Sequence, residues 1–482
     1  MGIHARGETL MAPLASLLAV ACALALGGCA TVSPDGGMGD LKALTQSRLQ
    51  GAQMDLPGGP DAQSRQAVAD LLAQPVGIDA AVRIALLNNP GLQASLATLG
   101  ISDADRAQAG SLLNPHLSLG RMVEGDKVEI ERALGFNLMA LLTLPWRAQW
   151  AGQQTELARL QAAQDVVRLA ADTRKAWVHA VAAQQSARYM GDVKEAAEAG
   201  AELARRLARV GNWSRLNQAR EQSFLADATA QLARAEQTAF ASRERLTRLM
   251  GLWGAQTTFR LPERLPDLPS AARVLADVEA QAIGQRLDVR SAMREAAFVA
   301  DSLGFQRATG FINALDLSLV RNTTFDNSTG ARETLRGVEI ELPLPVFDWG
   351  QARNARAQAV YMQSVARVRE VGVRARSEAR EAYHGYRTAY DLARHYRDEV
   401  VPLRKFINDE VLLRYNGMIS GIFELLADAR TNVAAVNASL EAQRDFWLAD
   451  TDLHTTLTGT SAGGLGALTS AATSGGAEPK GH

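Results

Sequence analysis

Reactive and charged side chains form few chemically meaningful combinations in this chain of 482 residues. Glu424 and Asp428 have a spacing that places two carboxylates on one face of a helix. His384 and His395 would lie roughly 16 Å apart on a helix, too far to share a metal ion. The sequence has no nucleotide-binding glycine loop, no nucleophile elbow and no zinc-type cluster. We therefore expect no enzymatic activity, no metal site and no cofactor.

Cys29 is the other reactive position, and it follows an apolar run from about residue 12 to residue 26. The run is too short to span a bilayer and is typical of a signal-peptide core. The two glycines before Cys29 resemble the lipobox of bacterial lipoproteins, in which cleavage leaves the cysteine as an acylated N-terminus. We expect residues 1–28 to be a signal peptide and Cys29 to carry fatty acyl chains such as palmitate. An ordinary cleavage site with an incidental cysteine is the alternative reading.

Composition narrows the fold class and the partners. Only 5% of residues are aromatic. Cys22 would leave with the signal peptide and Cys29 would be acylated, so no thiol remains for a disulfide. The net charge of -1 gives no electrostatic reason to expect nucleic acid as a partner.

The chain repeats itself after roughly 200 residues, too long a period for a solenoid repeat. Gly211 and Ser214 correspond to Gly417 and Ser420. Further matches are Leu117-Ser118-Leu119 with Leu317-Ser318-Leu319, Leu144-Pro145 with Leu344-Pro345, and Ala176-Trp177 with Ala382-Tyr383. We interpret the chain as a duplicated half-protein.

Very long helices are predicted in both halves. No proline occurs between Pro145 and Pro262, and a helix over 146–210 would span on the order of 100 Å. Gly211 ends this helix, and Ser214 is placed to cap a returning helix that reaches about residue 250.

The second half repeats the pattern with a helix from about residue 350 to 415, which Pro402 should bend. Ser420 is expected to cap the return helix, which ends near residue 457. Helices of this length must lie against one another as coiled coils.

Between these helices the pattern changes to period two, which predicts strands with one apolar and one polar face. From residue 127 to 139 the even positions are apolar, with Arg132 as the exception, while Glu129 and Glu131 have the other parity. Similar alternation occurs at 315–319 and 338–344, with a polar turn expected over 322–333. Such strands suit either a transmembrane barrel or a buried sandwich sheet.

Five segments follow from these patterns. They are the signal peptide 1–28, an acylated extended tether 29–70, a first structural repeat 71–265, a second structural repeat 266–457, and a disordered tail 458–482. Each repeat is expected to have the order helix, strand, strand, long helix, turn, helix.

Four strands cannot close a barrel in lipid, where open sheet edges are not tolerated. Three chains would supply twelve strands. We therefore predict a mainly α fold with a small β part, in which a homotrimer forms a 12-stranded β-barrel on a long α-helical barrel.

The chain resembles the outer-membrane efflux protein (TolC) family, in its lipoprotein branch, from about residue 77 to residue 457. The matching segments are Ala85-Leu86-Leu87-Asn88-Asn89-Pro90-Gly91-Leu92, Asn114-Pro115-His116-Leu117, Leu342-Pro343-Leu344-Pro345-Val346-Phe347-Asp348-Trp349-Gly350 and the two Gly-x-x-Ser turns. The resemblance implies a passive exit duct in the outer membrane with a long periplasmic extension. It would work with a periplasmic adaptor protein and an inner-membrane transporter.

The resemblance also implies roles for individual residues. Gly211, Ser214, Gly417 and Ser420 correspond to the turns that contact the adaptor in this family. Well-known members carry two gate aspartates on the lumen side shortly after the second turn, where this sequence has Glu424 and Asp428 in a different register. These two residues form either a carboxylate gate in the lumen or an exposed charged face.

Three functions remain on this reading. The first is the outer-membrane channel of a tripartite efflux system for small toxic solutes or metal ions. The second, with the same architecture, is the channel of type I protein secretion. The third is a non-conducting, envelope-spanning coiled-coil lipoprotein scaffold, which would lack alternating strands between its helices.

Overall fold

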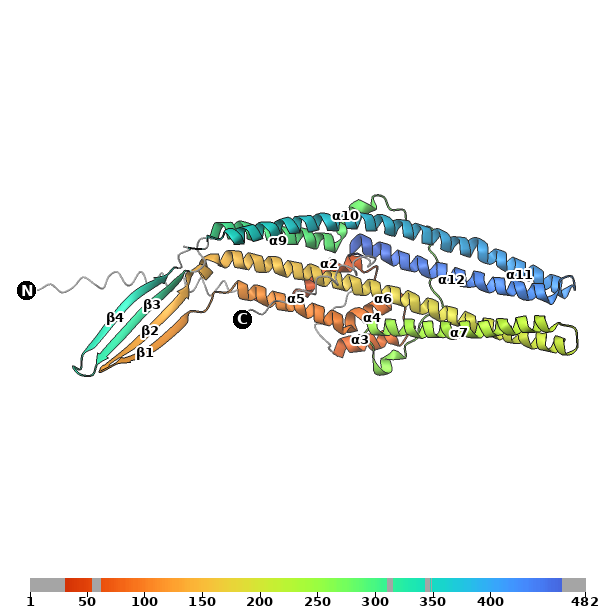
Figure 1. The fold of residues 1–482 in the computed structure, drawn as a ribbon, viewed down its shortest axis with the longest axis horizontal. Helices are drawn as coiled ribbons and strands as arrows, with labels where there is room; N and C mark the ends of the chain where they lie inside the picture. Colours follow the sequence, from red (N-terminus) through yellow and green to blue (C-terminus); the bar gives the residue numbers. More distant parts are fainter. Residues whose placement is uncertain (1–30, 54–61, 310–314, 343–346, 348, 462–482) are drawn as a thin grey trace, which may run out of the picture. The chain divides into compact units, whose positions relative to one another are not determined.

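The computed structural model describes residues 31–53, 62–309, 315–342, 347 and 349–461 of the protein (Figure 1). The same order of elements occurs twice, which confirms the predicted fold class of long helices with a small antiparallel sheet. The first half contains α4 (Ile78–Asn88), α5 (Pro90–Ala109), β1 (His116–Glu124), β2 (Lys127–Asn137), α6 (Leu138–Arg209) and α7 (Arg215–Leu249). The second contains α8 (Val278–Gln285), α9 (Leu287–Thr309), β3 (Asp316–Asp326), β4 (Arg332–Glu341), α10 (Gln351–His395), α11 (Val401–Asn416) and α12 (Ile422–Thr458).

The duplication extends to the side chains that anchor each half. The indole N–H of Trp177 on α6 donates a 2.8 Å hydrogen bond to the carbonyl of Val76, just before α4. In the second half the hydroxyl of Tyr383 on α10 accepts a 3.3 Å hydrogen bond from the amide of Leu275, just before α8. Each long helix therefore holds the start of its own short helix with an aromatic polar group.

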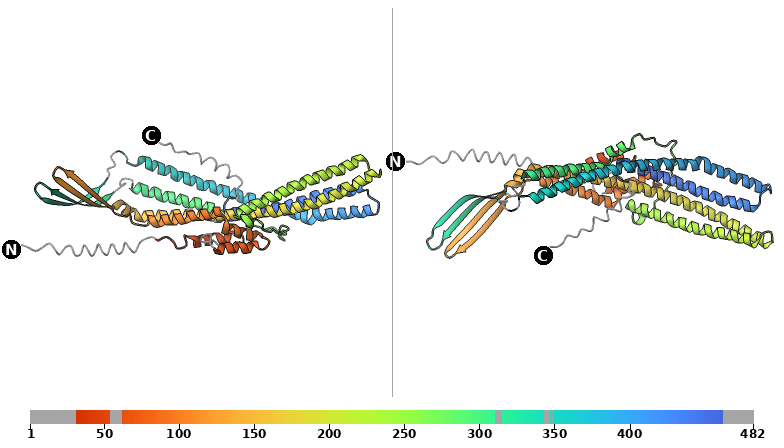
Figure 2. Two further views of the ribbon diagram at one scale, coloured as in Figure 1. Left: turned by 90° about the horizontal axis from the view of Figure 1, so that it is seen from below. Right: turned by 45° about the horizontal axis from the view of Figure 1, so that its top comes forward.

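The four strands form one antiparallel sheet in the order β1-β2-β3-β4 (Figures 1 and 2). The two hairpins, one from each half, join where β2 pairs with β3. The turn predicted over 322–333 is shorter, because β3 continues to Asp326 and β4 begins at Arg332. The run Thr323-Thr324-Phe325 favours a strand, and this explains the difference.

The long helices depart from the prediction in two places: α6 begins at Leu138 and not at residue 146, and the helix predicted to residue 415 is interrupted after α10. α6 has 72 residues and includes Pro145 near its start, whereas a π-helical turn, η3 (Tyr396–Val400), separates α10 from α11. Pro402 lies directly after this turn and lacks the amide hydrogen that a regular helix needs there. No described helix is both long enough and apolar enough to cross a bilayer.

Two compact units make up the chain, and neither corresponds to one repeat. The first comprises residues 1–37, 97–159 and 291–368 and includes the sheet. The second comprises 38–96, 160–290 and 369–482 and includes both helix–turn–helix hairpins. Each unit thus combines segments of both repeats, so the predicted repeats 71–265 and 266–457 describe the duplication and not the packing.

The second unit has a separate apolar cluster for each half of the chain. Trp177 and Met250 lie in the first cluster, and Tyr386 and Phe446 lie in the second, with ring centroids 5.7 Å apart. The short helix α3 (Ala62–Leu72) packs on the first cluster through Val68, and the 3-10 helix η2 (Gly254–Thr257) follows α7 in the chain.

The segment predicted as an extended tether, 29–70, is partly helical. It contains α2 (Met38–Thr45) and the 3-10 helix η1 (Gln46–Arg48) as well as most of α3. Leu41 and Leu49 are almost completely buried, and Arg48 donates a 2.9 Å hydrogen bond to the carbonyl of Thr458 at the end of α12. Burial of these leucines outweighs the weak periodicity of the sequence. Cys29, the signal peptide and residues 462–482 of the predicted tail lie outside the described residues.

Candidate functional site

Charge is divided between the two faces of the sheet. The strand register places every acidic residue of the four strands on one face, together with Lys127 and His116. These acidic residues are Glu124, Glu129, Glu131, Asp316, Asp326, Glu333, Glu339 and Glu341. Contacts on this face agree with the register, because the side-chain amide of Asn322 donates a 3.1 Å hydrogen bond to the carboxylate of Glu129.

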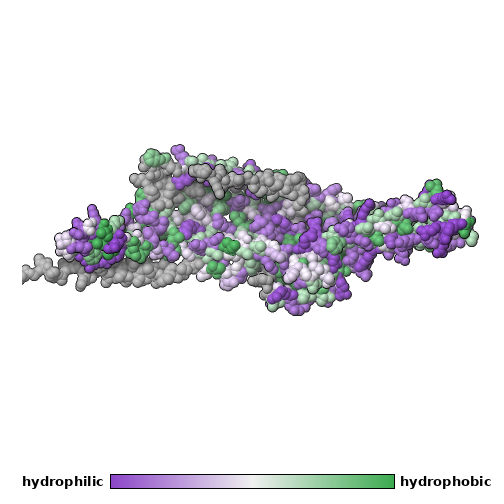
Figure 3. Space-filling view, turned by 60° about the horizontal axis from the view of Figure 1, so that its bottom comes forward, coloured by the Kyte–Doolittle hydropathy of each residue, from purple (hydrophilic) through white to green (hydrophobic). Residues whose placement is uncertain are grey.

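The opposite face is apolar apart from arginines and the threonines Thr323 and Thr334. Its aliphatic and aromatic residues are Leu117, Leu119, Val123, Val128, Ile130, Leu134, Phe136, Leu317, Leu319, Phe325, Val338 and Ile340. Many are solvent-exposed in the single chain, for example Leu117 at 66% and Leu119 at 69%. Hydrophobic and strongly hydrophilic residues lie next to each other over the strands in Figure 3. An exposed apolar sheet face of this size requires a covering partner or lipid.

The first helix turn matches its prediction. Gly211 adopts a left-handed conformation with φ +81°, and the amide of Asn212 donates to the carbonyl of Leu207 at 3.0 Å. Ser214 caps α7 by accepting a 3.2 Å hydrogen bond from the amide of Asn217. The turn is therefore a glycine C-cap followed directly by a serine N-cap.

The second turn differs in two respects. Its left-handed residue is Met418 (φ +57°), whereas Gly417 has φ −79°. α12 begins after Gly421, and Ser420 does not cap it; its buried Oγ has no hydrogen-bond partner among the described residues. The prediction of a serine cap at Ser420 is therefore wrong, because α11 continues to Asn416 and shifts the whole turn by one residue, so that Met418 and Gly421 occupy the positions of Gly211 and Ser214. Met418 and Ile419 are 93% and 79% exposed at this turn.

This difference predicts unequal effects of two matched substitutions. Ser214→Ala should lower the free energy of unfolding by about 1 kcal/mol, since it removes a cap. Ser420→Ala should leave it unchanged or raise it slightly, because it removes a buried, unpaired hydroxyl. Urea titration of the helical circular dichroism signal measures both values, and equal losses would contradict the assigned turn geometry.

Glu424 and Asp428 lie in the first two turns of α12, as predicted, with Glu424 exposed and Asp428 half-buried. Asp428 Oδ2 is buried without a hydrogen-bond partner among the described residues. Whether the pair forms a gate stays a prediction.

The sequence analysis missed an ion pair near the same end of α12. Arg430 donates a 2.8 Å hydrogen bond to Glu221 of α7, whose side chain is only 5% exposed. The guanidinium also lies 4.5 Å from the ring centroid of Phe224. These contacts connect α7 with α12, the return helices of the two hairpins. No sequence signal links residues 209 positions apart.

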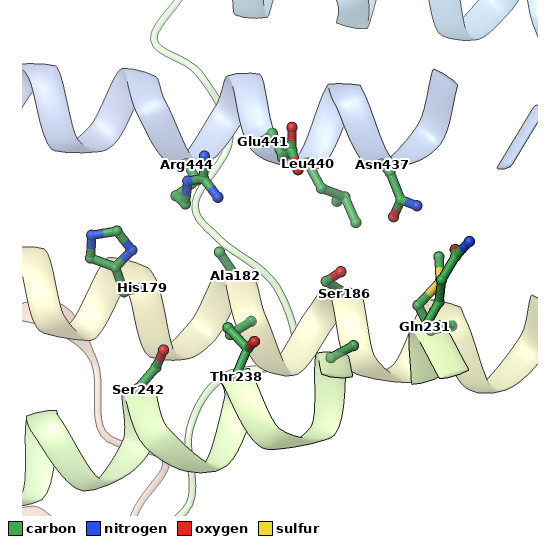
Figure 4. A pocket seen from close by; sticks show the side chains of 13 residues that line it. His179, Ala182, Ser186, Gln231, Thr238, Ser242, Asn437, Leu440, Glu441 and Arg444 are labelled. Atoms are coloured by element: carbon green, nitrogen blue, oxygen red, sulfur yellow. The ribbon is translucent and has the colours of Figure 1, made fainter. Parts of the chain in front are cut away.

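A cavity of about 290 Å³ lies between α6, α7 and α12 (Figure 4). His179, Ser186 and Ser242 are directed toward it from α6 and α7, and Glu441 and Arg444 line it from α12. Burial, and then the charge of Arg444, lower the pKa of His179. In the described part of the chain no three His, Cys, Asp or Glu residues are placed to hold a metal ion.

The half-buried His454 is expected to make stability depend on pH. Burial, followed by the positive charges of Arg273, Arg174 and Arg48, lowers the pKa of His454 from 6.5 to about 4. The unfolded chain therefore binds this proton first as pH falls. Stability is complete above about pH 6.5 and declines toward pH 4 by at most about 1.4 kcal/mol per pH unit.

His454→Gln should remove this contribution. We expect the difference in unfolding free energy between variant and parent to grow in favour of the variant as pH falls from 6.5 to 4.5. Asp450, whose pKa burial raises despite its ion pair with Arg273, acts in the opposite direction in both proteins and cancels in the comparison. A pH-independent difference would refute the assignment.

Comparison with known structures was decisive for the fold. The chain aligns with the outer-membrane channel OprN at a TM-score of 0.65 and 17% identity, covering 86% of this chain and 95% of OprN. The chain has the fold of the outer-membrane channels. It matches no family model and no curated protein sequence.

Two further channels support this result. The outer membrane protein VceC of Vibrio cholerae aligns at a TM-score of 0.64 and 15% identity, with 80% of this chain and 96% of VceC covered. The open state of the Neisseria gonorrhoeae MtrE outer membrane channel gives 0.64 and 18%, with 79% and 89% covered. The fold of an outer-membrane channel, expected from the sequence motifs, is confirmed.

Proposed function

We propose that this protein is the outer-membrane channel of a tripartite efflux system, in which it forms a passive exit duct from three copies of the chain. The observation that carries this proposal is the open four-stranded sheet, with free edges at β1 and β4 and an exposed apolar face. A sheet with open edges is not tolerated in lipid, whereas three such sheets joined edge to edge close a barrel of twelve strands.

The distribution of charge between the two faces of the sheet determines which face contacts lipid and which lines the passage. Turning the acidic face toward hydrocarbon would place carboxylates from all four strands in lipid, at a cost of several kcal/mol for each charge near the midplane. The apolar face therefore contacts lipid, and the acidic face lines the passage. A wall of this charge favours cations over anions, which suits cationic toxic solutes or metal ions as cargo.

Three further assignments belong to this proposal. Acyl chains on Cys29 would anchor the protein in the outer membrane beside its barrel. The periplasmic adaptor would dock at Gly211, Ser214, Gly417 and Ser420, where exposed apolar residues such as Met418 offer contact area. An inner-membrane transporter would supply the energy and select the substrate.

Two other functions account less well for the observations. A non-conducting scaffold would have no use for four alternating strands with an exposed apolar face. A type I secretion channel would share the architecture, but a polypeptide carries both charges and gains little from a predominantly acidic wall.

Ion selectivity tests the proposal. We expect the protein, in planar bilayers with a potassium chloride gradient, to show a reversal potential of cation-selective sign. The combined variant Glu131→Gln, Glu339→Gln and Glu341→Gln should reduce the cation-to-anion permeability ratio roughly several-fold, because it removes charge from the wall. Arg321→Gln, on the other face, is the matched control and should leave the ratio unchanged. Anion selectivity or no conductance in the parent would contradict the proposal.

A further inference from the structure

Three arginines lie at one level across the apolar face of the sheet. Arg321 of β3 is directly opposite Arg336 of β4. The β2–β3 register that pairs Ala133 with Val320 brings Arg132 opposite Arg321. We call Arg132, Arg321 and Arg336 the arginine row. Arg121 of β1 lies on the same face, one side-chain level nearer the turns.

This arrangement is unfavourable in the isolated chain. Directly opposed positions on neighbouring strands are only about 5 Å apart, and like charges there are destabilising. A guanidinium is always charged and has five donors to satisfy. Every carboxylate of the strands is on the other face. Across the described residues, no member of the row forms an ion pair or a side-chain hydrogen bond. The row therefore lacks an anion.

The row also marks the level at which this face changes from continuously apolar to mixed. Toward the helices, the next two levels of this face are aliphatic or aromatic, among them Leu319 and Phe136. Leu141 and Leu142, at the start of α6, are also exposed. Toward the turns, the face is mixed: the next level holds Arg121, Ile130, Thr323 and Thr334, and the level after it holds Val123, Val128, Phe325 and Arg332. The row thus lies about 13 Å along the strands from the last apolar level before the helices.

In a membrane, phosphate groups occupy the layer directly outside the hydrocarbon. The guanidinium group binds phosphate in a bidentate manner and can reach it from the edge of an apolar surface. The turns are the end of the sheet away from the periplasmic helices, so the layer in question belongs to the outer leaflet. We propose that the arginine row binds the phosphate groups of lipids in the outer leaflet of the outer membrane. This inference rests on the proposed function, because it needs the barrel to be inserted.

Lipid retention measured by native mass spectrometry tests the inference. The full-length protein is reconstituted in phosphatidylcholine vesicles that contain a small fraction of phosphatidylglycerol or of bis-phosphorylated lipid A, and is then released with mild detergent. We expect the parent to retain the phosphorylated lipids in preference to phosphatidylcholine. Each Arg→Gln substitution in the row should weaken this retention roughly five-fold.

Several variants keep the test interpretable. Lys127→Gln, on the acidic face, is the matched control for Arg321→Gln and should retain lipid like the parent. Arg→Lys at all three positions preserves charge and should retain part of the preference. If a variant with all three arginines replaced by glutamine does not insert, the single Arg321→Gln substitution still allows lipid retention to be compared with that of the parent.

The outcomes separate this inference from the proposed function. Equal lipid retention by the parent and the Gln variants, with normal conductance in both, would overturn the inference and leave the channel intact. Saturable binding of inorganic phosphate by the detergent-solubilised protein, with no lipid preference, would show a site for free anions and would also overturn it. A parent that neither inserts nor conducts would overturn the proposed function itself.

Discussion

Arg286→Met is expected to lower the free energy of unfolding by about 3 to 5 kcal/mol, because it removes a fully buried cation that pairs with two carboxylates. The Arg286 side chain is completely buried between α8 and α9. It donates hydrogen bonds to Asp288 at 2.6 and 2.9 Å and to Glu378 of α10 at 2.7 Å. Burial lowers the pKa of Arg286, but the two carboxylates more than offset this and raise it. The methionine would leave both carboxylates close together without a counter-charge.

The control for this prediction is Arg380→Gln. Arg380 also connects α10 with α8, through a 2.7 Å contact to Glu279, but its side chain is 62% exposed. Its loss should cost less than about 1 kcal/mol. Adding Asp288→Asn and Glu378→Gln to Arg286→Met should recover much of the loss, since no uncompensated charge remains. Urea titrations compare all three proteins, and similar effects of the two arginine substitutions would refute the role assigned to Arg286.

Arg430→Ala is expected to loosen the contact between the two helix hairpins near their turns. The substitution leaves Glu221, which is almost fully buried, without its ion-pair partner Arg430. Because Arg430 itself is partly exposed, we expect the cost to be nearer 2 than 5 kcal/mol, which corresponds to a roughly 30-fold change in a local opening equilibrium. Hydrogen–deuterium exchange should accelerate by about this factor in residues 215–222 and 422–430.

Arg205→Ala is the matched control, because Arg205 pairs with Glu202 of its own helix on the exposed surface. Exchange in the same segments should be unchanged in this variant. If Arg430→Ala leaves exchange at the parent's rate, the ion pair does not hold the hairpins together. If the duct is narrowed at these turns, the loosened variant should also pass larger solutes.

Local patterns in the sequence predicted most of the fold. The end of the first hairpin follows from Gly211 and Ser214, and the strands follow from period-two alternation in residues 127 to 139. The expectation failed where tertiary contacts outweigh local signals. α2 forms in a segment of weak periodicity because its Leu41 is buried, and the second turn places Met418, not Gly417, in the left-handed conformation.

The candidate site was likewise predictable from the sequence only in part. The alternation of Glu129 and Glu131 with apolar residues indicated an acidic face, and Arg132 was visible as an exception. Its alignment with Arg321 and Arg336 depends on the strand register, which sequence alone did not provide. The Glu221–Arg430 ion pair likewise depends on how two distant helices meet.

The central claim is that β1 of one chain joins β4 of the next, and disulfide trapping tests it most directly. Within one chain these edge strands are separated by β2 and β3, about 14 Å apart and beyond disulfide reach. Ser118→Cys is combined in turn with Leu335→Cys, Gly337→Cys and Glu339→Cys, and membranes are analysed under non-reducing conditions after boiling. We expect at least one pair to give covalent dimers and trimers that vanish on reduction. Monomers with free thiols across the whole set would contradict the account.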